Sequence, residues 1–349
     1  MRAVDNGHLK EGMRVARTVF DESGRVLLKE GVVLNYRYIN RLKEIGIPFI
    51  YIEDELLGHI EVEDVIDERV KLQTVEVLKN VTKNASLHQD LDIRPVSNMV
   101  NKILNDLKGT PNLLVQLMDL RSAGTYLYNH SVGVSVLSIL TGMTLGFDDL
   151  KLKVLGMGAI LHDIGKSISK GPDHTTQGFE ILRNDKSLSI IAAHVAYQHH
   201  ERYDGTGFPR QLSGKEIHLY ASITSVADFY DNLVSVKDKN KQQRLFPYQA
   251  IEKVVALQEK AFHPEVVKAF CRNIAPYPIG TAVRLNNGVI GVVLSVPKDY
   301  STRPIIKMIT DKNGVLQKDF PEIDLLEEKD LKICEIISEE ERQRTVSKI

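Results

Sequence analysis

The chain has 349 residues, a length typical of two or three domains and sufficient to bury a large hydrophobic core. Lysine and arginine total 45 against 46 aspartates and glutamates, a formal net charge of −1, which argues against a nucleic-acid coat or a membrane-surface protein. Hydrophobic residues make up 43% and charged residues 26%, so the composition excludes a disordered chain. We expect a folded protein that binds neither a nucleic-acid polymer nor a membrane, and that binds anionic ligands locally.

The two cysteines indicate a reducing compartment. Cys271 and Cys334 lie far apart and form no CxxC pair, so neither a disulfide framework nor a thiolate zinc site is predicted. The first residues lack the apolar segment of a signal peptide, and no apolar run of about 18 residues occurs. We therefore expect a cytoplasmic location.

Residues 1–60 alternate short apolar runs with turn-forming residues, which predicts a small β-rich N-terminal domain. Asn35 is suited to cap a helix that ends before Gly46, which gives this domain α+β character. The strands expected here span residues 14–20, 25–28 and 48–53.

Residues 61–119 are predicted to form a helical connector. Residues 61–93 contain neither glycine nor proline and place apolar side chains near helical spacing, so we expect one long helix there. A second helix is expected over residues 96–107, before the break at residues 109–111.

Residues 120–275 are predicted to be all helical, whereas residues 276–349 change to β character. In the C-terminal range, two apolar runs flank the turn Asn286-Asn287-Gly288, which is typical of a hairpin, and a third run precedes another glycine-containing turn. We therefore expect a multidomain fold, in which a central all-α bundle lies between a small α+β N-terminal domain and a β-barrel-like C-terminal domain, built as a small barrel or a meander.

Seven of the chain's 11 histidines lie within residues 130–218, where an even spread would place about three. His162 and Asp163 end a helix predicted over residues 150–164, and Gly165 fits the position just past its C-terminus. An imidazole can bind one metal ion while an adjacent carboxylate bridges two. The clustered histidines are His130, His162, His174, His194, His199, His200 and His218.

Four segments resemble the HD-GYP family of metal-dependent cyclic di-GMP phosphodiesterases. They are HDIGK (162–166), HTTQG (174–178), HHERYDGTGFP (199–209) and VADFYD (226–231). The resemblance covers about residues 120–260 and implies that the all-α bundle is an HD domain. It further implies hydrolysis of cyclic di-GMP to linear pGpG, with GMP as the alternative end product.

The resemblance also implies a centre of two divalent metal ions. Asp163 would bridge the ions, a hydroxide held between them would attack phosphorus, Lys166 would neutralise charge on the scissile phosphate, and Asp231 would support that lysine or the attacking water. Nitrogen and oxygen ligands suit iron or manganese first, with nickel, cobalt, magnesium and zinc as alternatives. The implied ligands are His130, His162, Asp163, His174, His199, His200 and Asp228.

Substrate contacts follow from the same motifs, and four departures from the family pattern affect the site. Tyr126 stands where members with three metals carry glutamate, which favours two metals. Phe208 replaces a tyrosine and keeps only ring stacking on guanine, Lys237 replaces an arginine, and the segment before His174 is shortened, which leaves the site more open. The implied contacts are Lys166, Gly205, Gly207, Phe208, Pro209 and Lys237.

Structural roles and other functions remain as alternatives. Gly205 and Gly207 can serve a turn that needs positive φ, and His194 and His218 are interpreted as structural. The metal site could act on another cyclic dinucleotide or a linear nucleotide. The chain could also be a non-enzymatic cyclic dinucleotide receptor, and its terminal domains could mediate a homodimer or bind a signalling partner.

Overall fold

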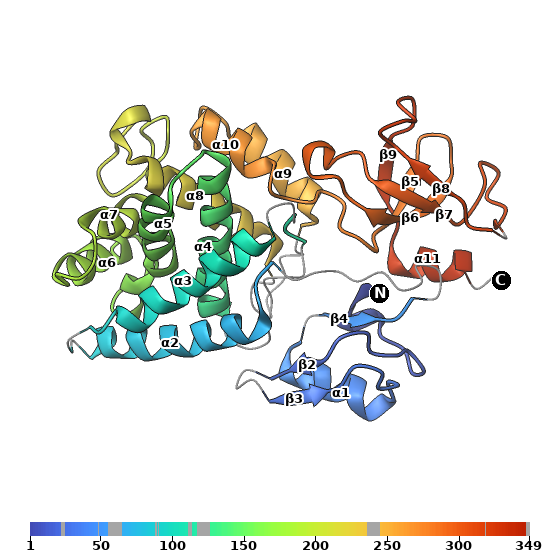
Figure 1. The fold of residues 1–349 in the computed structure, drawn as a ribbon, viewed down its shortest axis with the longest axis horizontal. Helices are drawn as coiled ribbons and strands as arrows, with labels where there is room; N and C mark the ends of the chain where they lie inside the picture. The colour runs from blue at the N-terminus through green and yellow to red at the C-terminus, as the bar shows by residue number, and fades with distance from the viewer. Residues whose placement is uncertain are drawn as a thin grey trace.

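A computed structural model describes residues 1–21, 25–47, 49–54, 65–87, 89, 91–110, 114–116, 126–235, 245–317 and 319–346. The chain forms a small N-terminal domain, a central helical bundle and a C-terminal sheet domain, coloured in that order from blue to red (Figure 1). Within the described ranges, no helix is both long and apolar enough to cross a membrane.

The N-terminal domain consists of two short antiparallel strand pairs and one helix. Strand β1 (Arg2–Asp5) pairs with β4 (Phe49–Ile52), and β2 (Val19–Phe20) pairs with β3 (Val26–Leu28). Helix α1 (Tyr36–Ile45) confirms its prediction, because the Asn35 side chain accepts a hydrogen bond from the Tyr38 amide and Gly46 ends the helix at φ 79°. Sequence reasoning missed β1 and the 3-10 helix η1 (Asn6–His8). Most of the predicted turn before β3 lies outside the described residues.

The connector contains the two helices predicted, but the first is shorter than the expected residues 61–93. Helix α2 (Glu68–Ser86) begins only after Asp67, whose side chain caps it by accepting a hydrogen bond from the Arg69 amide. Helix α3 (Arg94–Gly109) confirms the helix predicted over residues 96–107 and carries proline in its first turn, where proline is tolerated. The lack of glycine and proline in residues 61–93 therefore overestimated the length of the first helix.

The bundle is built around helices that are apolar on nearly every side. Helix α4 packs against α5 and α8, α5 also packs against α7, and α6 pairs with α7. A helix that is apolar all round is stable only when buried, so these sequences force the helices into one core. The bundle elements are α4 (Tyr126–Thr144), α5 (Asp149–Leu161), η2 (Ile164–Ser167), α6 (His174–Arg183), α7 (Ile190–Gln198), η3 (Gly214–Glu216), α8 (Leu219–Val234), α9 (Pro247–Ala256) and α10 (Pro264–Cys271).

The C-terminal domain is an open antiparallel sheet, so the predicted meander is confirmed and the closed barrel is wrong. Its strand order is β8-β7-β6-β5-β9, and the edge strands β8 and β9 do not pair with each other. Apolar side chains form separate small clusters, one around Val292 and Ile309 and one around Val293 and Ile306, rather than one enclosed interior. The strands are β5 (Ala282–Leu285), β6 (Ile290–Ser295), β7 (Ile305–Met308), β8 (Glu322–Asp324) and β9 (Ile333–Ile336), with η4 (Lys298–Tyr300) between β6 and β7.

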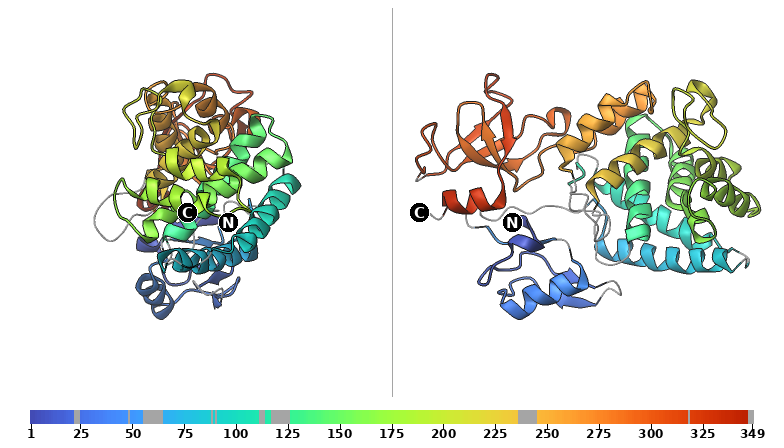
Figure 2. Two further views of the ribbon diagram at one scale, coloured as in Figure 1. Left: turned by 90° about the vertical axis from the view of Figure 1, so that its left-hand side faces the viewer. Right: turned by 180° about the vertical axis from the view of Figure 1, so that it is seen from behind.

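Two further features of this domain bear on the predictions. The hairpin expected around residues 286–288 is confirmed as β5 and β6. Helix α11 (Glu339–Val346) was not predicted, although three glutamates in its first turn and an arginine in its last complement the helix dipole. Helix α11 lies beside the N-terminal domain in Figure 1 and in the right view of Figure 2, where Arg2 and Asp54 pair with its side chains.

Candidate metal centre

The seven predicted metal ligands converge on one buried point between five helices. Helix α4 contributes His130, the residues directly after α5 contribute His162 and Asp163, and α8 contributes Asp228. The first residue of α6 and the two residues after α7 supply the remaining three. Their ligand atoms form three overlapping groups, each within 4.8 Å: His174 with His199 and His200, His130 with His162 and Asp228, and His162 with Asp163 and His199.

Local hydrogen bonds fix which nitrogen of each buried ring faces the centre. The Nδ1 atoms of His162, His174 and His199 lie 2.7, 2.5 and 2.9 Å from backbone carbonyl oxygens three residues earlier in the chain. The Nδ1 of His130 lies 2.7 Å from Asp231 Oδ2. Each ring therefore presents Nε2 to the centre, an arrangement typical of metal-ligating histidines.

Asp163 lies between two groups of imidazoles, with one carboxylate oxygen facing each. Its Oδ2 is 3.4 Å from His162 Nε2 and 3.9 Å from His130 Nε2. Its Oδ1 is 3.4 Å from His174 Nε2 and 3.6 Å from His199 Nε2. Asp163 Oδ1 and His162 Nε2 are buried and have no hydrogen-bond partner among the described residues. Buried polar atoms are normally satisfied, so this donor set fits two cations bridged by Asp163.

The carboxylates hold protons on the imidazoles closest to them. Burial opposes charge on His130, but hydrogen bonds with Asp228 and Asp231 raise its pKa to about 10. Burial likewise opposes charge on His162, but Asp163 and Asp228 raise its pKa to about 9. In the absence of cations, these two rings are the positive counterparts of the carboxylates at neutral pH. Cations that bind there must displace their protons.

Unlike His130 and His162, the imidazoles of His174 and His200 on the other side of the centre carry no positive charge. Burial, reinforced by the neighbouring His199, lowers the pKa of His200 to about 2. Burial also lowers the pKa of His174. Both rings are therefore neutral at physiological pH, which is the form that binds metal.

Asn232 on helix α8 and Ser235, the residue directly after that helix, support the centre. Asn232 Nδ2 donates a 2.7 Å hydrogen bond to Asp228 Oδ1. Ser235 Oγ donates a 3.0 Å hydrogen bond to Asp231 Oδ2, the oxygen that contacts His130. Asp231 therefore lies against His130, whereas the sequence interpretation associated it with Lys166 or the attacking water. Sequence reasoning missed Asn232, although its spacing of four from Asp228 on a predicted helix was the available signal.

Two family models match the chain. The HD domain matches residues 127–233, a range that contains all seven converging ligands, and a KOW domain associated with the HD domain matches residues 282–345. The first range coincides with the helices that surround the metal centre, and the second with the open sheet and α11.

Relatives with named activities also match the chain. The chain is 31% identical over 231 residues to a cyclic di-GMP phosphodiesterase of Pseudomonas aeruginosa, covering 61% of this chain and 55% of that protein. It is 31% identical over 181 residues to a cyclic di-GMP phosphodiesterase of Thermotoga maritima, covering 46% and 47%. The chain contains an HD domain and is similar over that range to cyclic di-GMP phosphodiesterases. It spans about half the length of these two curated relatives.

A third relative has a different named substrate. The 3'3'-cGAMP-specific phosphodiesterase 3 of Vibrio cholerae is 30% identical over 161 residues, which cover 40% of this chain and 33% of that protein.

Gly165, in the HDIGK segment, corrects one prediction. It does not follow a helix as a left-handed terminator, because α5 ends at Leu161 and Gly165 lies inside η2. A Cβ atom at Gly165 would come within 3.0 Å of backbone atoms of His174 and Gly178, so glycine is needed for the close approach of η2 to α6. This approach brings His174 to Asp163. Lys166 follows directly, half-exposed, and its ammonium donates to Asp163 Oδ2.

The Gly-Phe-Pro segment lies in a loop that a buried carboxylate holds in place. Glu201 accepts hydrogen bonds from the amides of Arg210 and Leu212, at 2.8 and 3.0 Å. Gly205 has φ 79°, whereas a Cβ on Gly207 would lie 2.5 Å from His200 O, so both glycines serve the backbone of this turn. Sequence reasoning missed Glu201, for which the pattern offered no signal.

The rim of the centre contains Phe208, whose ring centroid is 4.8 Å from that of His200. Pro209 follows and is exposed. Lys237 and the side chain of Tyr126 lie outside the described residues.

The other two clustered histidines lie apart from the ligand groups. His194 packs its ring 4.9 Å from Phe179, and His218 caps α8 by accepting a hydrogen bond from the Tyr220 amide at 3.1 Å. These positions agree with their structural interpretation.

Proposed function

We propose that this chain is a metal-dependent phosphodiesterase that hydrolyses cyclic di-GMP to pGpG, with GMP as the alternative end product. The observation that carries the proposal is the position of Asp163, whose two oxygens face separate imidazole groups that can each hold a cation. The names of the Pseudomonas and Thermotoga relatives support the substrate.

Seven residues would hold two divalent cations, and iron or manganese suits their nitrogen and oxygen donors. When bound, such a pair supplies water activation and charge neutralisation at the phosphoryl oxygens. The protein's own part is to fix the donor geometry: carbonyl oxygens orient three imidazoles, and Asn232 and Asp231 orient Asp228 and His130.

The open side of the centre supports the substrate assignment. The Lys166 ammonium lies half-exposed beside the bridging carboxylate, so it can donate a hydrogen bond to a phosphate oxygen that approaches from solvent. Phe208 lies at the same rim against His200, where its exposed ring edge or face can contact a guanine base. Gly207 lets the backbone of the loop turn back against His200 without a side chain in the way.

The test is an anaerobic incubation of iron- or manganese-loaded protein with cyclic di-GMP, with substrate, pGpG and GMP resolved by chromatography. We expect turnover in the wild type and its loss in Asp163→Ala. His199→Asn is expected to abolish turnover while His194→Asn, the same substitution one helical turn away and outside the ligand groups, leaves it within about threefold. Absence of turnover at confirmed metal occupancy would refute the proposal.

A second substrate is favoured by one residue and one relative. Phe208 lacks the hydroxyl of the family's tyrosine, and the Vibrio relative is named for 3'3'-cGAMP. A parallel incubation with 3'3'-cGAMP separates the two substrates by their kcat/KM ratio. Tight nucleotide binding without turnover of either substrate would instead favour the receptor hypothesis.

A further inference from the structure

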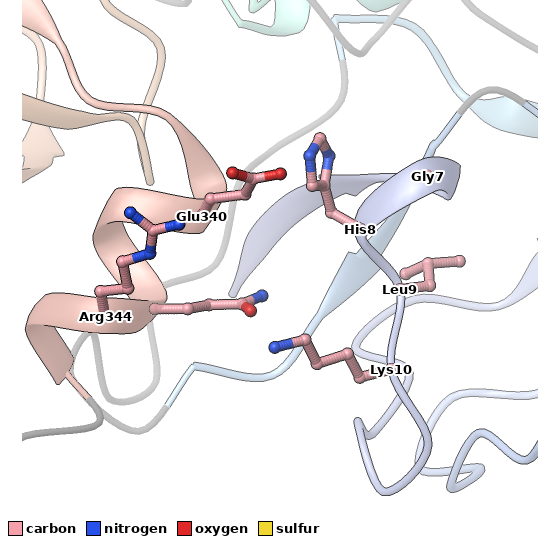
Figure 3. A pocket seen from close by; sticks show the side chains of 7 residues that line it. Gly7, His8, Leu9, Lys10, Glu340 and Arg344 are labelled. Carbon is pink, nitrogen blue, oxygen red and sulfur yellow. The ribbon is translucent and has the colours of Figure 1, made fainter.

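A pocket of about 460 Å³ lies between the N-terminal domain and helix α11, far from the metal centre in the fold. One wall consists of Gly7, His8, Leu9 and Lys10, and the other of Glu340, Gln343 and Arg344. Figure 3 shows the polar ends of His8 and Lys10 directed toward α11. The volume is in the range of small-molecule sites, and the lining is polar.

Buried ion pairs fix the two walls relative to each other. Arg2 on β1 lies 2.9 Å from Asp54 and 2.6 Å from Glu339, and Arg342 donates to Asp54. The side chains of Arg2, Asp54 and Arg342 are each less than one-tenth exposed. We call Arg2, Asp54, Glu339 and Arg342 the terminal clamp. Removing one partner from such a buried network is strongly unfavourable, so the clamp holds the N-terminal domain on α11.

The pocket continues directly from the clamp on both sides. Residues 7–10 follow strand β1, which carries Arg2, and the α11 lining residues alternate with Glu339 and Arg342 along the same helix. The clamp therefore keeps the two walls at a fixed separation. A site with rigid walls loses less entropy when a ligand binds.

Two cations in the pocket are left without carboxylate partners. Among the described residues, neither Lys10 nor Arg344 forms an ion pair. Three carboxylates close to them in sequence are engaged elsewhere, since Glu11 accepts from the Tyr36 amide, Glu339 pairs with Arg2 and Glu341 pairs with Arg284. Glu340, four residues before Arg344 on α11, is the one carboxylate among the described residues that lines the pocket.

The side chains of His8, Lys10 and Arg344 are all suited to bind an anion. His8 can add a further hydrogen bond from its ring, and its charge increases the positive potential when it is protonated. Arginine binds planar carboxylate and phosphate groups through two hydrogen bonds, and lysine contributes a point charge. An anion placed between Lys10 and Arg344 would neutralise both and would bridge the two terminal domains.

We propose that this interdomain pocket binds a small organic anion through Lys10 and Arg344, recognising a phosphate or carboxylate group. The site is independent of the metal centre, and its ligand would strengthen the contact between the N-terminal domain and α11. The terminal domains would thereby carry a small-molecule binding site that is separate from the metal centre.

Isothermal titration of the full-length protein tests this proposal, with inorganic phosphate and citrate as separate probes. We expect one of them to bind with one equivalent per chain in the pocket and to raise the melting temperature. Lys10→Ala and Arg344→Ala are each expected to weaken that binding at least tenfold, whereas Lys29→Ala, an exposed lysine of the same domain, leaves it unchanged. All three positions are exposed, so the variants should fold as the wild type does.

The two probes distinguish the ligand class. Binding of phosphate alone assigns a phosphate group, and binding of citrate alone assigns a carboxylate. The proposal is overturned if neither probe binds, or if both variants bind as tightly as the wild type, because the anion then occupies another site such as the metal centre.

Discussion

Gly165→Ala should separate η2 from α6 and impair the metal centre. The added Cβ would overlap the His174 carbonyl oxygen, its nearest neighbour, and would lie 2.5 Å from the Gly178 nitrogen, and both are backbone atoms that cannot rotate away. An ordinary Cβ contact begins near 3.4 Å, so the two segments must move apart by more than about 1 Å. Because α6 begins at His174, that movement carries the imidazole away from Asp163.

The cost follows from overpacking of a close-packed interior. We expect a loss of about 2 to 3 kcal/mol in the free energy of unfolding and a fall of roughly 5 to 10 °C in the melting temperature of the helical domain. A displacement of about 1 Å at a reacting centre typically lowers activity about 100-fold. The assays are thermal unfolding of the metal-free protein and metal content after reconstitution.

Gly178→Ala is the matched control in the same interface. Its Cβ would meet Ala196 and the Gly165 nitrogen at 3.4 Å, which is ordinary contact, and alanine is favoured over glycine within a helix. We expect unchanged or slightly higher stability and full metal content. If Gly165→Ala unfolds at the wild-type temperature and binds two metals, the close-approach argument is refuted.

Three further predictions concern the charges and supports of the centre. In metal-free protein the pKa values of His130 and His162 are raised above about 6.5, so their stabilising effect is complete below that pH and is lost as pH rises through 9 to 10. The melting temperature in chelator should therefore fall between pH 7 and 10, and a flat profile there would contradict the pKa values. Metal binding at pH 7 should release about two protons, measured by calorimetry in buffers of different ionisation enthalpy; no release would show that both rings are already neutral. Asn232→Ala removes the 2.7 Å hydrogen bond to Asp228 and should weaken metal binding about 10- to 100-fold in chelator competition, whereas wild-type affinity would show that the bond does not position the ligand.

The resemblance to the HD-GYP motifs selected seven residues that converge in the structure, and four of them directly follow helices that had to be buried. His162 and Asp163 follow an apolar helix, and His199 and His200 follow another, so helix burial alone directs these groups inward. The cap and the end of α1 were likewise predictable, since Asn35 and Gly46 act on neighbouring backbone groups.

Features that depend on distant contacts could not be predicted. The role of Gly165 depends on how closely a second helix approaches it, and the support of the loop by Glu201 depends on backbone amides nine and eleven residues away. The barrel prediction failed because strand alternation specifies which residues are buried but not whether the edge strands meet. The terminal clamp joins Arg2 to Glu339, and no local pattern indicates such a pairing.

The most direct test of the two-cation centre is an anaerobic titration of the metal-free protein with manganese in the presence of cyclic di-GMP, with hydrolysis followed by chromatography at each step. We predict that pGpG formation appears mainly as the second equivalent binds, because Asp163 must face a cation with each oxygen. Full activity at one equivalent, or no hydrolysis at two, would contradict this account.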